Sequence, residues 1–234
     1  MRCSRVWSLA ALTVALGVGG AARADGAEPG GCAREVAARV QARYDGVRDL
    51  EAHFTQRSRS VAFGGSGPEM HARGVALFAK PGRMRWTYEE PERSVVVSDG
   101  QTLWIYDPAA KEIQEYPVGQ GFLSGTAVQF LLGDGKILDA FEVHADTCEG
   151  ETVRLFLRPR TETSYERLEL VVVPKTGDVR ETAVVDLFGN RTDVVFDSLR
   201  ANRRPDASQF RLEPEPGVRV LRAPPAPAGA PSSQ

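Results

Sequence analysis

Residues 80–108 read KPGRMRWTYEEPERSVVVSDGQTLWIYDP, and their alternating pattern decides the fold predicted for the chain. Met84, Trp86 and Tyr88 fall on one face of a segment whose other face carries two arginines and a threonine. Such alternation predicts a strand with one buried face. A proline ends this strand because it cannot donate to a sheet, and Asp99-Gly100 predicts a tight hairpin turn. The stretch therefore predicts three antiparallel strands rich in aromatic side chains, with no catalytic constellation among them.

Similar patterns continue on both sides of this stretch. Upstream, Val36, Val40 and Tyr44 recur at every fourth residue, which predicts a helix over residues 33–44 with Gly46 as a left-handed cap. Turn-forming residues separate alternating segments along the rest of the chain, as is typical of an all-β sheet or barrel. Besides the three strands above, strands are predicted at 50–61, 70–78, 112–116, 141–145, 153–157, 167–173, 180–187 and 192–197, with a last short one at Phe210 and Leu212.

A second short helix is predicted over residues 126–132, and it is apolar nearly all round. A helix without a polar face must lie against another part of the protein. Glycines follow it, so its exit is expected to be flexible. Its apolar side chains, which we predict to cover the sheet, are Val128, Phe130, Leu131 and Leu132.

The two ends of the chain have compositions that set them apart from the predicted domain. Residues 1–24 combine a basic start, an apolar run and an A-x-A site, which predicts a signal peptide and an exported protein. Residues 25–32 are predicted to be a Gly-rich, flexible lead-in, and 33–222 are predicted to be one domain. Residues 223–234 are rich in proline and alanine and are predicted to be disordered.

Charge and cysteine content limit the function classes further. The full chain has a net charge of −2, and removal of the predicted signal peptide takes away three arginines and no acid, leaving −5. An acidic chain argues against nucleic acids and against adhesion to anionic lipid surfaces. Cys32 and Cys148 would remain after export. They are predicted either to form a disulfide or to stay as free thiols, and the sequence leaves both open.

Signatures of catalysis and metal binding are missing from the sequence. The three histidines, His53, His71 and His144, lie in separate predicted strands beside polar residues, where a surface position is the more common outcome. The chain contains no H-E-x-x-H, no G-x-S-x-G and no complete P-loop. We therefore predict a protein that is not an enzyme and needs no cofactor or metal.

Several motifs in and around the quoted stretch resemble the outer-membrane lipoprotein carrier family. Phe54-Thr55-Gln56 fits its first strand, residues 126–132 its lid helix, and Phe210 with 214–220 its last segment. The resemblance covers most of the chain after residue 24. Its most specific part is the central series of Pro81-Gly82-Arg83-Met84-Arg85-Trp86, Pro91, Ser98-Asp99-Gly100, Leu103-Trp104 and Tyr106-Asp107-Pro108.

This resemblance implies a fold and a function. The fold is mainly β: a single antiparallel sheet curled into an open half-barrel, with an N-terminal helix and a short central helix as its lid. The function is that of a monomeric periplasmic chaperone. It would take acylated lipoproteins from an inner-membrane ABC transporter, shield their acyl chains and pass them to the outer membrane, where an acceptor lipoprotein is a further expected partner.

The resemblance also assigns roles to residues. It places Lys80 where the family has an arginine that latches the closed lid, and we expect lysine to make a weaker latch because it lacks the planar fork. It implies an acyl-chain cavity, although the residues alone favour an ordinary core for such side chains. The cavity residues so predicted are Phe54, Phe78, Met84, Trp86 and Tyr88.

Three other functions stay open at this point. A periplasmic lipid sensor or shuttle could share the same half-barrel, although such proteins usually carry a second domain. An exported hydrolase would depend on one of the three histidines, and a purely structural domain would have a solid core without a ligand.

Overall fold

The computed structural model describes residues 30–61, 68–118 and 135–222. The predicted signal peptide, the tail and the lid helix with Val128, Phe130, Leu131 and Leu132 lie outside these residues. Two helices, one 3₁₀ helix and twelve strands are described. They are α1 Gly31–Asp45, β1 Asp49–Arg59, β2 Met70–Ala79, β3 Arg83–Glu90, β4 Ser94–Ser98, β5 Thr102–Asp107, β6 Glu112–Pro117, α3 Ile137–Ala140, β7 Phe141–Ala145, β8 Val153–Pro159, β9 Tyr165–Val172, β10 Val179–Asp186, β11 Arg191–Ala201, η1 Ala207–Phe210 and β12 Arg219–Arg222.

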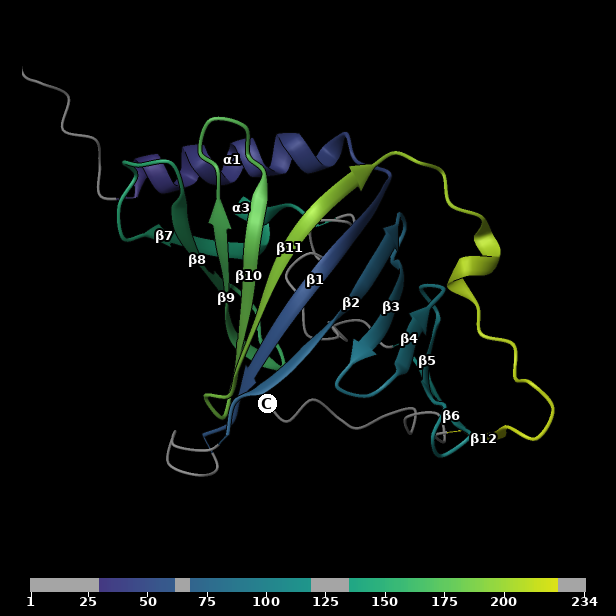
Figure 1. The fold of residues 1–234 in the computed structure, drawn as a ribbon. Coiled ribbons are helices and arrows are strands. Elements are labelled where there is room, and N and C mark those ends of the chain that lie inside the picture. Colours follow the sequence, from purple (N-terminus) through teal and green to yellow (C-terminus); the bar gives the residue numbers. More distant parts are fainter. Residues whose placement is uncertain (1–29, 62–67, 119–134, 223–234) are drawn as a thin grey trace, which may run out of the picture.

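The strands form one twelve-stranded sheet whose order is β12-β6-β5-β4-β3-β2-β1-β11-β10-β9-β8-β7. Neighbours pair antiparallel except β12 and β6, which run parallel. The two ends of the sheet, β12 and β7, are not paired with each other among the described strands, so the sheet is open. Figure 1 shows it curled, with the long strands β1, β2 and β11 crossing between a group of strands on each side. The predicted mainly β, open architecture is confirmed.

The central stretch folds as its pattern predicts. Met84 pairs with Phe78 of β2 and Trp86 with Ala76, so the apolar face of β3 continues that of β2. Along the chain, most strand boundaries fall within one or two residues of the predicted ones. Local alternation suffices in β3 because its fully buried side chains, Met84 and Trp86, lie on one face.

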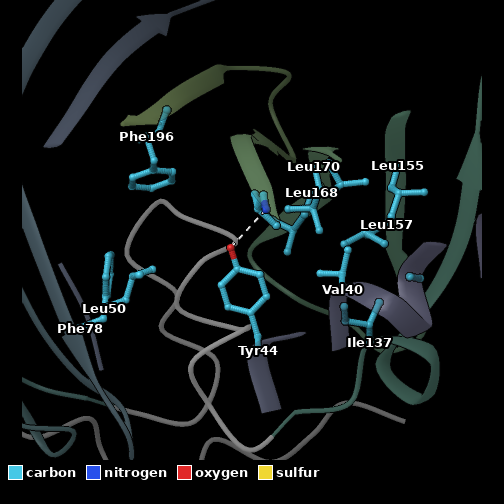
Figure 2. Close-up of a cluster of buried hydrophobic side chains, with 14 of the residues drawn as sticks. Val40, Tyr44, Leu50, Phe78, Ile137, Leu155, Leu157, Leu168, Leu170 and Phe196 are labelled. Atoms are coloured by element: carbon cyan, nitrogen blue, oxygen red, sulfur yellow. Dashed lines mark hydrogen bonds between the residues drawn. The ribbon is translucent and has the colours of Figure 1, made fainter. Parts of the chain in front are cut away.

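Helix α1 lies against α3 and β7, across one end of the curled sheet (Figure 1). Its buried face includes Val36, Val40 and Tyr44, the residues of the predicted stripe. Figure 2 shows Val40 and Tyr44 directed toward leucines of β8 and β9. The Tyr44 hydroxyl accepts the backbone N–H of Val179 at 3.2 Å, and burial, the largest influence, raises the pKa of that hydroxyl. The stripe thus closes one side of the core.

The left-handed cap expected at Gly46 is wrong. Gly46 has a φ of −81°, in the right-handed region. The Tyr44 carbonyl at the end of α1 accepts the N–H of Gly46 and of Val47, and also the Lys80 ammonium at 2.9 Å. Two backbone N–H groups that follow α1 and the distant Lys80 side chain therefore satisfy the Tyr44 carbonyl, so no left-handed residue is needed to cap the helix.

The predicted last strand at Phe210 and Leu212 is also wrong. Residues 207–210 form η1, which Asp206 caps by accepting the Ser208 N–H at 2.8 Å, and the last strand is β12. Phe210 is fully buried, and η1 contacts β3. The aromatic residue anchors a segment that crosses the outer face of the sheet; it does not extend an edge.

Candidate functional site

The inner face of β1, β2 and β3 carries a continuous group of aromatic side chains. Phe54 comes from β1, Phe78 from β2, and Met84, Trp86 and Tyr88 from β3. Their strand registers place all five on the same face, because Phe78 pairs with Met84 and the others follow at two-residue steps. All but Tyr88 are fully buried. The structure therefore brings together the residues predicted to line an acyl-chain cavity.

The rings of this group meet edge to face. Trp86 lies 4.7 Å from Phe54 and 5.4 Å from Phe78, measured between ring centroids, with the planes near perpendicular. Tyr88 approaches Phe54 at 5.2 Å. Edge-to-face pairs of this kind stabilise a packed group by about 0.5–1.5 kcal/mol each beyond the area they bury. The cluster is a defined structural unit with an almost wholly apolar surface.

Two polar atoms lie at its border. The Tyr88 hydroxyl donates to Gln56 Oε1 at 3.2 Å, and burial raises the pKa of that hydroxyl. The indole Nε1 of Trp86 is buried and has no hydrogen-bond acceptor among the described residues. A buried donor without an acceptor costs free energy, and no polar group of the described residues offsets that cost at Trp86.

One residue that the sequence did not single out carries the cluster into the second half of the sheet. Phe196 of β11 pairs with Phe54 and lies 6.3 Å from Trp86. Leu50, opposite Phe78 in β1, continues the same face (Figure 2). The alternation in β11 could have indicated Phe196 as inward-facing, but only the pairing of β1 with β11 shows that it adjoins Trp86.

Lys80 occupies the turn between β2 and β3. Its ammonium donates to the Tyr44 carbonyl at 2.9 Å, and its backbone N–H donates to the Arg48 carbonyl at 2.8 Å. The lid that Lys80 is predicted to latch lies outside the described residues. Within them, Lys80 attaches the α1 C-terminus to the β2–β3 turn.

The remaining predicted residues lie away from the cluster. Cys32 and Cys148 form a disulfide that joins the start of α1 to the segment between β7 and β8. His53, His71 and His144 are exposed and lie on three different strands. In the part of the chain that the structure describes, no three His, Cys, Asp or Glu side chains gather into a group that could hold a metal ion. No described helix is long and apolar enough to span a membrane.

With this geometry established, comparison with known proteins gives the family. A family model described as "Outer membrane lipoprotein carrier protein LolA" matches residues 45–213, more than two thirds of the chain. The chain belongs to the outer membrane lipoprotein carrier family. The match begins at the last residue of α1 and runs through β11 to just beyond η1.

Two curated proteins of the carrier family are similar to this chain in sequence. An outer-membrane lipoprotein carrier protein of Methylibium petroleiphilum is 30% identical over 222 residues, covering 94% of this chain and 99% of that protein. One from Pseudomonas paraeruginosa is 28% identical over 183 residues, covering 77% and 86%. Among solved structures, a LolA superfamily protein from Nitrosomonas europaea matches 77% of this chain and 97% of its own, at 10% identity and a TM-score of 0.46.

Proposed function

We propose that this protein is a periplasmic carrier that shields the acyl chains of lipoproteins between the inner and the outer membrane. The observation that carries the proposal is the inward-facing aromatic cluster on an open, curled sheet, in a chain of the carrier family. Rings and the flexible thioether of Met84 suit alkyl chains, which have no fixed shape and form no hydrogen bonds. No chemical step is part of this function, and catalysis is not proposed.

Energetics limit how such a carrier works. Burial of alkyl chains contributes about 0.8 kcal/mol per methylene, so several long chains together exceed the ceiling of about 20 kcal/mol on reversible binding. Because Phe78 and Trp86 are already buried, acyl chains must displace protein atoms to reach them. Separating those atoms from the rings costs packing energy. This cost offsets part of the free energy gained by burying the acyl chains, so the cargo can still be released.

The displaced element in this proposal is the apolar segment 126–132. Its apolar side chains would cover the cluster in the empty protein and leave when cargo enters. The expected partners are acylated lipoproteins, an inner-membrane ABC transporter that releases them and an outer-membrane acceptor. The carrier itself is proposed to act as a monomer.

The two tryptophans that follow the predicted signal peptide provide a direct test. Trp86 faces the cluster, whereas Trp104 lies on the outer face of β5, opposite Val97. Acyl chains brominated along their length quench tryptophan fluorescence on contact. We expect brominated acyl chains to quench the wild type and a Trp104→Phe variant, and to leave a Trp86→Phe variant almost unquenched. Quenching that depends on Trp104, or none at all, would rule out acyl binding on the inner face.

The cargo can be identified by native mass spectrometry of the protein purified from a periplasmic extract. Co-purified acylated protein would support the lipoprotein carrier. Free lipid without protein would support the lipid sensor or shuttle that the sequence leaves open, and an empty protein would contradict both.

A further inference from the structure

A pocket of about 730 Å³ lies where the start of β1, the β2–β3 turn and the C-terminal segment meet, and its lining includes no residue of the aromatic cluster. Its charged lining consists of Arg48, Lys80, Arg83 and Arg204, opposed by the single carboxylate of Asp49. The pocket therefore holds an excess of three positive charges in a chain whose net charge is −2. Its volume falls in the range of small-molecule sites, which is about 300–1,000 Å³.

The one carboxylate is already engaged by the protein. Asp49 is buried and accepts the backbone N–H of Arg203 at 2.5 Å and that of Arg204 at 3.2 Å. These bonds hold the C-terminal segment against the start of β1. Asp49 therefore serves the backbone and does not pair with the guanidinium groups that line the pocket.

The four cationic side chains of the pocket have few hydrogen-bond or ion-pair partners among the described residues. The Lys80 ammonium donates one hydrogen bond within the described residues, to the Tyr44 carbonyl, although an ammonium has three protons to donate. Arg83 donates to the Lys80 carbonyl at 2.9 Å and lies over the Phe210 ring, but its buried Nε has no acceptor among the described residues. Neither Arg48 nor Arg204 forms an ion pair with any carboxylate in residues 30–61, 68–118 and 135–222.

We propose that this pocket binds a phosphate group that carries an organic body. Guanidinium groups match phosphate oxygens with paired, parallel N–H donors, and phosphate carries more charge than a carboxylate, which suits a site with several unneutralised cations. The other lining side chains, Ala79, Pro81 and Pro205, are small or apolar and leave room for a glycerol-sized body. The acidic remainder of the chain opposes broad adhesion to anionic surfaces, so recognition is confined to this pocket.

The phosphate can come from a soluble phosphate ester or from a lipid headgroup, and the experiment separates the two. Glycerol 3-phosphate and inorganic phosphate are titrated at low ionic strength while backbone amides are followed by NMR. Vesicles of phosphatidylglycerol are tested by co-sedimentation, with vesicles of an uncharged glycolipid as the reference. The pocket site predicts amide shifts confined to Arg48, Lys80, Arg204 and their chain neighbours, and an affinity that falls as salt increases.

The decisive variant is Arg48→Gln/Arg204→Gln, because both side chains are exposed and neither donates a hydrogen bond to any residue that the structure describes. Its control is Arg203→Gln/Arg158→Gln, which removes the same charge at two exposed arginines outside the pocket lining. We expect the pocket variant to bind glycerol 3-phosphate at least about tenfold more weakly than the control, since each charge-assisted bond contributes at that level.

Each outcome bears on the proposal. If the pocket variant, but not the control, loses binding to glycerol 3-phosphate, the result supports a soluble phosphate ester. If the pocket variant, but not the control, loses binding only to phosphatidylglycerol vesicles, the result supports a lipid headgroup. Equal binding by the two variants, or no binding by the wild type to either probe, overturns the proposal. The acyl-quenching result does not bear on it, because the pocket and the aromatic cluster involve different residues.

Discussion

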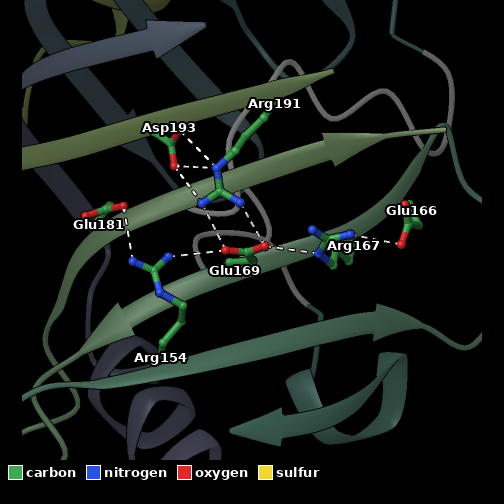
Figure 3. A network of polar contacts seen from close by, with 7 residues as sticks. All are labelled: Arg154, Glu166, Arg167, Glu169, Glu181, Arg191 and Asp193. Atoms are coloured by element: carbon green, nitrogen blue, oxygen red, sulfur yellow. Dashed lines mark hydrogen bonds and ion pairs between the residues drawn. The ribbon is translucent and has the colours of Figure 1, made fainter. Parts of the chain in front are cut away.

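Glu169 is the residue whose side chain has the most ion-pair partners among those described. It lies on the outer face of β9 and is buried there, with 4% of its side chain exposed. Arg191 grips both carboxylate oxygens at 2.9 Å, and Arg154 and Arg167 bond them from β8 and β9 at 3.2 and 3.0 Å (Figure 3). One carboxylate thus links β8, β9 and β11 on the outer face of the sheet.

Removal of this carboxylate is expected to destabilise the protein strongly. Glu169→Ala leaves three arginines, each only partly exposed, without their common partner, and we expect it to lower the free energy of unfolding by about 2–4 kcal/mol. Urea denaturation at neutral pH measures the difference. The matched control is Glu166→Ala, because Glu166 is exposed and pairs with Arg167 alone, which is worth less than about 1 kcal/mol. Equal losses in the two variants would contradict the account.

The same residue should make stability depend on acid. Burial is the largest single influence and opposes its ionisation, but hydrogen bonds and charges of Arg191 and Arg167 together hold the pKa of Glu169 below its ordinary value. A lowered folded-state pKa contributes stability that is fully present above the unfolded-state value of about 4.3 and is lost as pH falls through the folded-state value. Urea titrations at successive pH values below 5 should therefore show a steeper loss for the wild type than for Glu169→Gln. Parallel curves would exclude Glu169 as the source.

At the scale of elements, the C-terminal segment decides how the outer face of the first half is covered. Phe210 of η1 is buried under the Arg83 guanidinium, whose Cζ lies 5.0 Å from the ring centroid. Arg85 donates to the Gln209 carbonyl at 3.2 Å, and burial lowers the pKa of its guanidinium. β12 then joins β6 in parallel. The segment is held at η1 and at β12, with the ring as its apolar anchor.

A matched pair of phenylalanines tests this anchor. Phe210→Ala removes a fully buried ring and is expected to cost about 3–5 kcal/mol and to speed amide exchange in η1 and β12. Phe188→Ala removes a ring that is 82% exposed in the β10–β11 turn and should change stability by less than about 0.5 kcal/mol. Unchanged exchange in η1 after Phe210→Ala would show that the backbone contacts alone hold the segment.

At the scale of the whole molecule, the disulfide joins the start of α1 to the segment between β7 and β8, at one edge of the sheet. Cys32 and Cys148 are 116 residues apart in sequence. A crosslink over a loop of this length is expected to stabilise by about 4–5 kcal/mol on the chain-entropy account. Helix α1 closes one side of the core, so the crosslink also fixes the layer that Val40 and Tyr44 belong to.

Replacement of both cysteines measures that contribution. Cys32→Ser/Cys148→Ser should unfold at lower urea concentration by an amount equivalent to a few kcal/mol. A reducing agent should shift the wild type toward the variant and leave the variant unchanged. If a reducing agent lowers the unfolding midpoint of both proteins equally, the stabilisation does not come from this disulfide.

The sequence by itself determined the local structure and the inward face. Alternation places Met84, Trp86 and Tyr88 on one side of β3, and a repeat of four places Val36, Val40 and Tyr44 on one side of α1, because these periods follow from backbone geometry. The resemblance carried by residues 80–108 also indicated the family. The predicted strand boundaries were close to the observed ones wherever a turn-forming residue ends the alternation.

Only the tertiary structure decided what depends on contacts between distant segments. It places Phe196 next to Trp86 and shows that Phe210, predicted in a strand, lies in η1 and is buried. It also shows that the Lys80 ammonium donates to the Tyr44 carbonyl at the end of α1, and that Arg48 and Arg204 line one pocket. Neither period nor composition encodes these neighbours, since they arise from the curl of the sheet and from the return of the C-terminal segment across its outer face. Contacts between residues far apart in the sequence form only when the whole chain packs, so short sequence patterns do not predict them.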